Sequence, residues 1–242
     1  MLDLHGNYLI DDDNKFYISG DIHKSLMELQ QLTYLNLARN DFEDSYIPGF
    51  LGSLRNLRYL DLSNCYFGGR IPIPFESLPH LKYLNLSNNG LDGVIPHRLG
   101  DLSNLQFLDL SNNYLEGSIP IKLGNLSNLE YFDLHGNSFK GKIPSQLGKL
   151  TNLQELYLGH EYGDSALTID NRDHNGGQWL SNLTSLTHLH MLSISNLNKS
   201  NSWLQMVGKL PKLRELSLRN CDLSDHFIHS LSHSKFNFST SL

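Results

Sequence analysis

Residues 105–126 read LQFLDLSNNYLEGSIPIKLGNL. The stretch combines two marks, an L-x-x-L-x-L-x-x-N pattern from Leu105 to Asn113 and an Ile-Pro pair at Ile119-Pro120. Both marks recur along the chain. Prolines that follow an isoleucine are spaced 24 residues apart, at Pro48, Pro72, Pro96, Pro120 and Pro144. Two independent patterns with one period indicate a tandem repeat.

The leucine pattern can be followed through eight units. The first six are Leu32, Leu35, Leu37, Asn40; Leu57, Leu60, Leu62, Cys65; Leu81, Leu84, Leu86, Asn89; Leu105, Leu108, Leu110, Asn113; Leu129, Phe132, Leu134, Asn137; and Leu153, Leu156, Leu158, Glu161. The eighth is Leu213, Leu216, Leu218, Cys221. Two registers fit the seventh: Leu189, Leu192, Ile194, Leu197, or Leu186, Leu189, Met191. We favour the first, because it places Leu197 24 residues before Cys221.

Each L-x-L segment predicts a short strand, with Leu inward and the intervening residue outward, because strand side chains alternate between faces. Stacked copies would form a parallel sheet. The Asn position suits a ladder of buried amides that satisfy turn backbone groups. Cys65 and Cys221 occupy that position six repeats apart, which is roughly 29 Å at ~4.8 Å per strand. A disulfide needs Cα atoms within about 7 Å, so both are expected to be buried thiols.

The 24-residue spacing breaks twice, near the acidic stretch Asp11-Asp12-Asp13-Asn14 and within residues 159–178. The second stretch is polar and rich in Gly, which predicts a surface loop. We therefore expect one array over residues 1–242, with repeats at about 1–158 and 180–223. Insertions are expected near 9–17 and 159–178, and 224–242 reads as an incomplete repeat.

Composition narrows the function. The 242 residues include 48 Leu and 24 Asn, and the net charge is −6. A mildly acidic chain does not favour nucleic acid or anionic membrane as a partner. No apolar run is long enough to span a bilayer, and no signal peptide is visible. No nucleophile, phosphate-loop or kinase motif occurs, so no enzyme activity and no cofactor are expected. His226, His229 and His233 share helical spacing but have no completing ligand, so no metal site is predicted.

The repeat resembles that of plant extracellular leucine-rich repeat proteins, in which L-x-G-x-I-P follows the Asn. Three glycines match this motif together with the Ile-Pro pairs that follow them: Gly93, Gly117 and Gly141. Gly69-Arg70-Ile71-Pro72 fits as well, and Gly20-Asp21-Ile22-His23 differs only by His in place of Pro. The resemblance covers roughly residues 1–223 and is strongest to ectodomains of receptor-like proteins and receptor-like kinases.

The resemblance implies an α/β solenoid of 24-residue repeats. Its shape would be a right-handed superhelical horseshoe with a parallel sheet on the concave face, and a second short strand near L-x-G-x-I-P. It also implies an extracellular location and binding of a ligand or co-receptor. The Cys-paired caps and the transmembrane helix of such receptors have no counterpart here. The chain is therefore interpreted as a fragment of a longer receptor, and the membrane would be reached only through parts outside it.

Two columns of outward residues are expected on the concave face. One reads Asn36, Asp61, Asn85, Asp109, Asp133, Tyr157, Ser193, Ser217, and the other reads Tyr34, Tyr59, Tyr83, Phe107, Tyr131, Glu155, Met191, Glu215. Aromatic beside acidic residues suit recognition of a peptide, glycan or protein ligand. The alternative is that these residues only pack the strands. Candidate binding residues are Tyr59, Asp61, Tyr83, Asp109, Tyr131, Asp133, His135, Tyr157 and His160.

Asp109 and Asp133 would lie about 5 Å apart on adjacent strands, as in a retaining glycosidase. An open groove gives no desolvation, so hydrolysis is not favoured. Glycosylation sequons occur at Asn85, Asn125, Asn182, Asn198 and Asn237. Of these, Asn85 lies on the predicted concave strand.

The leading hypothesis is the ligand-sensing segment of a plant cell-surface receptor in defence or development, with a co-receptor kinase as a possible partner. It would lie on the extracellular side of the plasma membrane. Three alternatives stay open: a secreted inhibitor of microbial wall-degrading enzymes similar to polygalacturonase inhibitors, a truncated decoy, and an intracellular scaffold.

Overall fold

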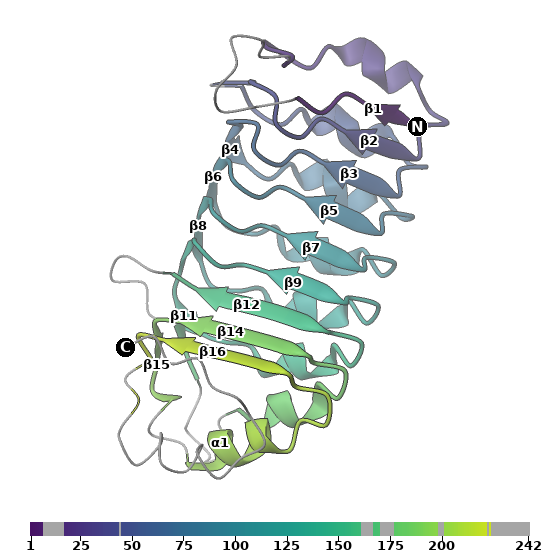
Figure 1. The fold of residues 1–242 in the computed structure, drawn as a ribbon. Helices are drawn as coiled ribbons and strands as arrows, with labels where there is room; N and C mark the ends of the chain where they lie inside the picture. The colour runs from purple at the N-terminus through teal and green to yellow at the C-terminus, as the bar shows by residue number, and fades with distance from the viewer. Residues whose placement is uncertain are drawn as a thin grey trace.

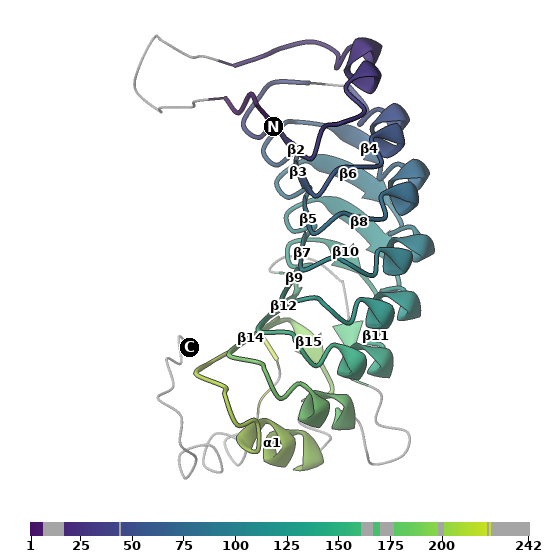
Figure 2. The same ribbon diagram turned by 90° about the vertical axis from the view of Figure 1, so that its right-hand side faces the viewer.

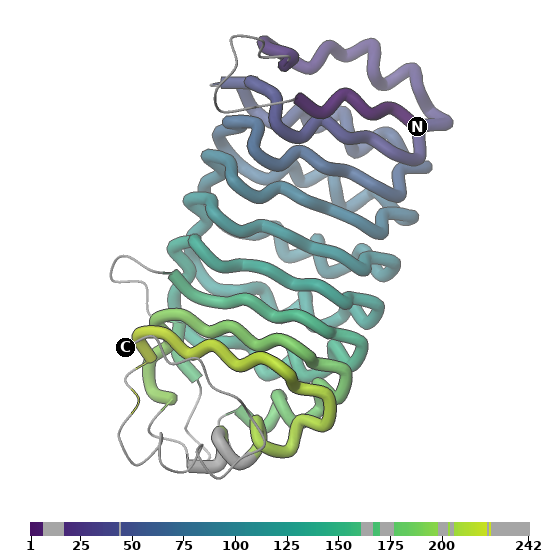
Figure 3. Tube along the Cα trace, viewed as in Figure 1, coloured from purple at the N-terminus to yellow at the C-terminus, as the bar shows by residue number. Residues whose placement is uncertain are grey.

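The computed structural model describes residues 1–6, 17–43, 45–160, 167–169, 177–197, 201–221 and 223. The described chain winds into a curved stack in which each turn adds one strand to the same parallel sheet (Figures 1 and 3). The strands line the inner side of the curve and short helices line the outer side (Figure 2). The prediction of a parallel repeat solenoid is confirmed.

The inner sheet, here called the concave sheet, has nine strands within the described ranges. In spatial order they are β1 (Leu2–Asp3), β2 (Tyr34–Asn36), β3 (Tyr59–Asp61), β5 (Tyr83–Asn85), β7 (Phe107–Asp109), β9 (Tyr131–Asp133), β12 (Glu155–Gly159), β14 (His188–Leu192) and β16 (Glu215–Arg219). Two smaller parallel sheets cover the flank. They are β10 (Ser138–Phe139), β8 (Tyr114–Gly117), β6 (Gly90–Gly93) and β4 (Gly68–Arg70), and β11 (Gly141–Lys142), β13 (Leu167–Thr168) and β15 (Ile194–Ser195).

The outer side carries one 3₁₀ turn per repeat. These are η1 (Lys24–Glu28), η2 (Gly49–Ser53), η3 (Ile73–Ser77), η4 (His97–Asp101), η5 (Ile121–Asn125), η6 (Ser145–Lys149) and η7 (Gln178–Asn182), followed by the α-helix α1 (Asn201–Gly208). Proline supplies the residue before η2 to η6, where its fixed φ holds the chain extended just ahead of the turn.

The core explains why the repeat is spelled with leucine. The central residue of each strand faces inward and stacks on its counterparts, as in the row Leu60, Leu84, Leu108, each with none of its surface exposed. Leucines of the 3₁₀ turns, such as Leu99 and Leu123, close the other side of this core. Because each repeat buries its leucines only against its neighbours, stability accumulates along the stack.

The predicted asparagine ladder is present. Asn113 accepts a hydrogen bond from the Leu91 N–H at 3.0 Å and donates to the carbonyl oxygens of Leu86, Leu110 and Ser111 at 3.0–3.2 Å. Asn137 repeats this pattern one turn later. Each buried amide therefore ties together two consecutive turns.

The two cysteines are free and buried, as expected. The Cys65 thiol donates to the carbonyl oxygens of Leu37 and Ser63, so it replaces the donor half of the Asn it stands for. A thiol does not supply the carbonyl oxygen of an Asn side chain. The backbone N–H of Phe42 is instead accepted by the backbone carbonyl oxygen of Cys65. Burial raises the pKa of the Cys65 thiol to about 12, which makes it a poor nucleophile.

The register favoured for the seventh repeat is wrong. Leu156 pairs with Leu189 and Leu158 pairs with Met191, and these in turn pair with Leu216 and Leu218. The frame is therefore Leu186, Leu189, Met191. The last step, from Leu189 to Leu216, is 27 residues, because α1 occupies the place of a shorter connection. The 24-residue period is therefore not kept in this repeat, and a frame based on it was wrong.

Part of the stretch predicted as an insertion, 159–178, is repeat structure. Gly159 ends strand β12, and Leu167–Thr168 forms β13 between β11 and β15. Leu167 and Ile169 are buried. Residues 161–166 and 170–176 of that stretch lie outside the described residues, as do 9–16 of the predicted insertion near 9–17 and all of the segment 224–242.

Candidate functional site

The concave sheet carries a ladder of stacked aromatic rings. Tyr34, Tyr59, Tyr83, Phe107 and Tyr131 start consecutive strands, and their ring centroids are 4.1–4.3 Å apart with interplanar angles of 7–12°. In-register pairing places these rings one above another. The faces of the inner rings are covered by their neighbours. Only ring edges and hydroxyl groups are therefore offered to a ligand.

The neighbouring column of Asp and Asn residues forms turns at the ends of the strands. Asp61 accepts hydrogen bonds from the backbone N–H and the hydroxyl group of Ser63, at 3.0 and 2.7 Å. Asn85 makes the same pair of bonds with Ser87. Such Asx turns satisfy the backbone as the chain leaves the strand. These side chains are thus held by their own repeat.

The tyrosines reinforce this arrangement. Tyr59 donates to the second carboxylate oxygen of Asp61 at 3.3 Å, and Tyr131 does the same to Asp133 at 3.2 Å. Asp61 and Asp133 are only 7% and 4% exposed. Burial, followed by the nearby carboxylates, raises the pKa of Tyr59 and Tyr131. The structure therefore places both carboxylates below the surface that a ligand would meet.

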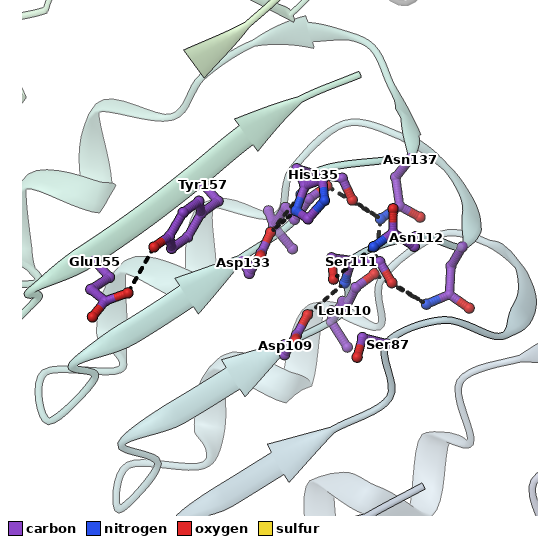
Figure 4. Close-up of polar contacts among 12 residues, drawn as sticks. Ser87, Asp109, Leu110, Ser111, Asn112, Asp133, His135, Asn137, Glu155 and Tyr157 are labelled. Carbon is purple, nitrogen blue, oxygen red and sulfur yellow. Dashed lines mark hydrogen bonds and ion pairs between the residues drawn. The ribbon is translucent and has the colours of Figure 1, made fainter. Parts of the chain in front are cut away.

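Asp109 differs from its neighbours because Phe107 has no hydroxyl group to offer it. It still accepts the Ser111 N–H at 2.9 Å (Figure 4). Burial raises the pKa of the Asp109 carboxyl, and the adjacent Asp133 adds to this, while bonds from Ser111 and Ser87 oppose it. Two carboxylates do come together here as the sequence predicts.

The ladder ends at β12, where the acidic residue comes first in the strand and the tyrosine comes third. The strand β9 reads Tyr131-Phe-Asp133, but β12 reads Glu155-Leu-Tyr157. The Tyr157 ring is tilted by 40° against Tyr131, with a centroid distance of 5.6 Å, and it lies 4.6 Å from the His190 ring. Tyr157 donates to Glu155 at 2.8 Å (Figure 4). The regular stack therefore opens between β9 and β14.

Two histidines that the sequence reading missed complete this region. The corrected register puts His188 and His190 in the two columns, where Met191 and Ser193 were expected. His188 lies 4.0 Å from Glu155 and 3.9 Å from Glu215, and His190 lies 3.1 Å from Glu215. The pattern that would have found them is the alternation His188-Leu-His190-Met191, with its inward Leu and Met.

The histidines differ in proton affinity. The Nδ1 atom of His135 lies 2.7 Å from Asp133 Oδ1, and this hydrogen bond raises the pKa of His135 (Figure 4). Burial lowers the pKa of His190, assisted by His188 and Arg219 and opposed by Glu215. This end of the concave sheet therefore holds one imidazole, His135, that is protonated more readily than usual and one, His190, that is protonated less readily.

A depression of about 200 Å³ lies between these side chains. It is lined by His135, Tyr157, Leu158, His190, Met191, Leu192, Ser217 and Arg219. It combines ring edges, an exposed guanidinium and a short apolar floor. We define the candidate site as this depression together with Glu155, His188 and Glu215 on its border.

The other predicted residues lie apart from this site. His160 follows β12 and lies on the flank beside Phe139 and Leu167, and its backbone N–H donates to the Leu192 carbonyl oxygen. Tyr59, Asp61 and Tyr83 belong to the regular ladder further along the sheet. Among the sequons, Asn125 and Asn182 are exposed at the ends of η5 and η7, while Asn85 is half-buried in its Asx turn. Asn198 and Asn237, like His226, His229 and His233, lie outside the described residues.

The described residues also give two negative findings. No helix among them is both long and apolar enough to cross a membrane. Within the same ranges, no group of three or more His, Cys, Asp or Glu side chains is arranged to hold a metal ion.

Comparisons with known proteins agree with this architecture. The family profile described as "Leucine-rich repeat region" matches residues 51–171, and that described as "Leucine Rich Repeat" matches 212–234. Receptor-like protein EIX1 of Solanum lycopersicum is 51% identical over 59 residues, which are 24% of this chain and 6% of that protein. The aligned part is thus a small share of a much longer relative.

Two solved structures illustrate the fold. The plant peptide hormone receptor RGFR1 in complex with RGF2 superposes with a TM-score of 0.71 and 29% identity, covering 84% of this chain and 30% of that one. The Arabidopsis receptor kinase HAESA, in complex with the peptide hormone IDA and the co-receptor SERK1, gives 0.68 and 31%, covering 84% and 32%. In both, the chain corresponds to about a third of the neighbour.

Proposed function

The chain belongs to the leucine-rich repeat family, and we propose that it is a ligand-binding segment of a plant cell-surface receptor. The ligand would be a peptide bound in extended form along the concave sheet. Signalling, in defence or development, would depend on parts outside this chain or on a partner co-receptor kinase. The location would be the extracellular side of the plasma membrane.

The observation that carries this proposal is the opening of the aromatic ladder between Tyr131 and His190. Elsewhere on the concave sheet, outward rings and carboxylates are engaged by their own or the adjacent repeat. At the opening, Tyr157, His190 and Arg219 border a depression that a side chain can enter. Aromatic and Arg side chains around a recess are the composition expected of a binding hot spot.

A peptide fits this surface better than a glycan. Sugars are commonly held against the open face of an aromatic ring, but the stacked rings from Tyr59 to Phe107 have both faces covered. Ring edges, hydroxyl groups and imidazoles suit the amide groups and side chains of a peptide. Peptide hormones occupy the related receptors RGFR1 and HAESA, which supports the same class of ligand here.

The test uses the full chain and a panel of synthetic peptides that includes RGF2 and IDA, together with peptides fractionated from plant extracellular fluid. A binding peptide should lose at least tenfold in affinity on Tyr157→Ala and His190→Ala, measured by calorimetry. Tyr114→Ala is the matched control, because that tyrosine is 71% exposed on the flank. Equal affinity of wild-type and concave variants would refute the assignment.

A further inference from the structure

A second recess lies on the outer edge of the solenoid, away from the concave sheet. It has a volume of about 1060 Å³ and is lined by residues around the starts of η3, η4 and η5. Figure 2 shows the side of the molecule on which the flank strands β4, β6 and β8 lie next to the outer helical turns. Its walls are the residues around each Ile-Pro pair. We call it the outer groove.

The outer groove has an apolar floor and an apolar rim. Ile71, Ile95 and Ile119 form the floor and are each 2% exposed. Ile73, Val94 and Ile121 stand on the rim and are 67%, 60% and 62% exposed. Isolated exposed aliphatic residues are ordinary, but three beside a continuous apolar floor mark a surface that gains by being covered.

Two side chains of the outer groove, Arg70 and Val94, lie against the next repeat. A Cβ on Gly93 would meet the Arg70 side chain at 3.3–3.5 Å, and a Cβ on Gly117 would meet Val94 at 3.0 Å. Arg70 and Val94 therefore lie across the bare backbone of the following glycine.

The charge of the outer groove is opposite to that of the chain. It contains Arg70, Arg98 and Lys122 but only one carboxylate, Glu76, while the whole chain carries −6. Arg98 lies 3.3 Å from Glu76, and Lys122 lies 3.7 Å from Asp101. Asp92 is paired in register with Arg70, but among the described residues no carboxylate forms an ion pair with it. One exposed guanidinium thus remains for an external anion.

From this surface we infer that the outer groove binds an extended segment of another protein that carries aliphatic side chains and at least one carboxylate. The aliphatic side chains cover the floor between Ile73 and Ile121, and the carboxylate pairs with Arg70, whose planar guanidinium suits bidentate binding. Two copies of this chain, each with a net charge of −6, repel one another overall, so a second copy is the less favourable occupant. The inference is independent of the concave-sheet ligand, because the two surfaces lie on different sides.

The experiment is a display library of random dodecapeptides selected on the full wild-type chain after subtraction on the Arg70→Glu, Ile73→Ser double variant. Selected peptides should be rich in Asp or Glu and in Ile, Leu or Val. Their affinity should fall at least tenfold on Arg70→Glu alone and on Ile73→Ser, Ile121→Ser. Lys140→Glu, which makes the same charge change outside the outer groove, should leave it unchanged. The substituted groove residues are all exposed, and circular dichroism verifies that each variant folds.

Three results would overturn the inference. In the first, the subtraction leaves no peptide, and in the second, the selected peptides bind the groove variants as tightly as wild type. In the third, sedimentation shows a dimer of the wild-type chain that Arg70→Glu dissociates, so that the occupant is a second copy. Loss of binding on Tyr157→Ala with no loss on Arg70→Glu would assign those peptides to the concave sheet, and it counts with the second result.

Discussion

Asp109 and Asn85 hold the same position in adjacent strands, but only Asp109 can carry a charge. Comparing them shows whether the turn that follows each strand requires a hydrogen-bond acceptor or a negative charge. Both accept the backbone N–H two residues further on, at 2.9 and 3.0 Å. The turn therefore needs an oxygen acceptor, and a negative charge is not required. The charge of Asp109 is instead opposed by burial and by Asp133.

Asp109→Asn should therefore keep the fold and be at least as stable as wild type at pH 7. Because the folded state raises the pKa of Asp109, this group destabilises the folded protein progressively as pH rises from its unfolded value of 3.8. The Asn variant lacks that pH dependence. Asp109→Ala loses the hydrogen bond and should cost about 1 kcal/mol. Urea unfolding at pH 4 and pH 7 distinguishes these outcomes, and an Asn variant as unstable as the Ala variant would show that the charge is needed.

Asp133→Asn tests the histidine at the candidate site. The bond from Asp133 raises the pKa of His135 above its usual 6.5, so the stabilisation is fully present below pH 6.5 and is lost as pH rises through the folded-state pKa. In the variant, an NMR titration should show that His135 titrates at a lower pH than in wild type. Its stability deficit relative to wild type should be larger at pH 5.5 than at pH 8. Asp133 also raises the pKa of His190, so the titration of His190 is followed separately in both proteins. A deficit that does not vary with pH would contradict the proposed coupling.

At the scale of elements, the aromatic ladder links consecutive strands through their side chains. Phe107 stacks on Tyr83 at 4.2 Å and on Tyr131 at 4.3 Å. Each such pair contributes ~0.5–1.5 kcal/mol beyond the area buried, so the loss of two pairs in Phe107→Ala should lower the free energy of unfolding by at least about 1–3 kcal/mol. Denaturant titration followed by circular dichroism measures this.

The matched control is Tyr114→Ala, which removes an aromatic ring from the flank strand β8, where it is 71% exposed. Its effect should be within about 0.5 kcal/mol. Equal losses for the two variants would mean that ring removal itself, and not stacking between strands, determines the cost.

Much of this architecture could be predicted from the sequence because it depends on local repetition. The L-x-x-L-x-L-x-x-N pattern of a single repeat predicts the strands, the buried leucine rows and the Asn ladder. The position of the two cysteines in that pattern predicts that they are free and buried. The seventh repeat could not be predicted by period, because α1 and the residues before Gln178 change the spacing. The frame of this repeat is decided by which face of the strand His188–Leu192 is apolar. In the structure that face carries Leu189 and Met191, and both are buried.

The site was predictable only in part. Tyr131 and Tyr157 were found from their columns, but the sequence could not show that Asp61 and Asp133 are buried by their own turns. That outcome depends on how closely neighbouring strands pack their side chains. His188 and His190 were missed through the register error, although they border the opening in the ladder.

At the scale of the whole molecule, the solenoid separates its surfaces by chemistry. Histidines and carboxylates gather at one end of the concave sheet, while the outer groove is apolar and basic. Rigid stacking of repeats keeps these surfaces at fixed distance from each other. A partner on the outer groove and a ligand on the concave sheet can therefore be bound at the same time without direct contact.

Glycosylation should respect the same division. Asn125 and Asn182 are exposed at the ends of η5 and η7, on the outer side, where a glycan meets no strand. The Asn85 side chain accepts two hydrogen bonds from Ser87, and its amide nitrogen lies 3.4 Å from the Tyr83 hydroxyl group. A sugar on that nitrogen would have to displace these contacts. When the full chain is secreted from plant cells behind an added leader, we expect glycans at Asn125 and Asn182 and none at Asn85.

Mass spectrometry of peptides released after deglycosylation in ¹⁸O-labelled water measures the occupancy of each sequon. Ser127→Ala and Thr184→Ala should each remove one glycan from the intact mass, because each destroys a sequon at an exposed Asn. Affinity for the ligand of the concave sheet should be unaltered by either change, since both positions lie on the outer side of the solenoid. High occupancy at Asn85 in folded protein would contradict the prediction. It would also confine ligands to the part of the concave sheet beyond β7, where the ladder opens and Tyr157 and His190 lie.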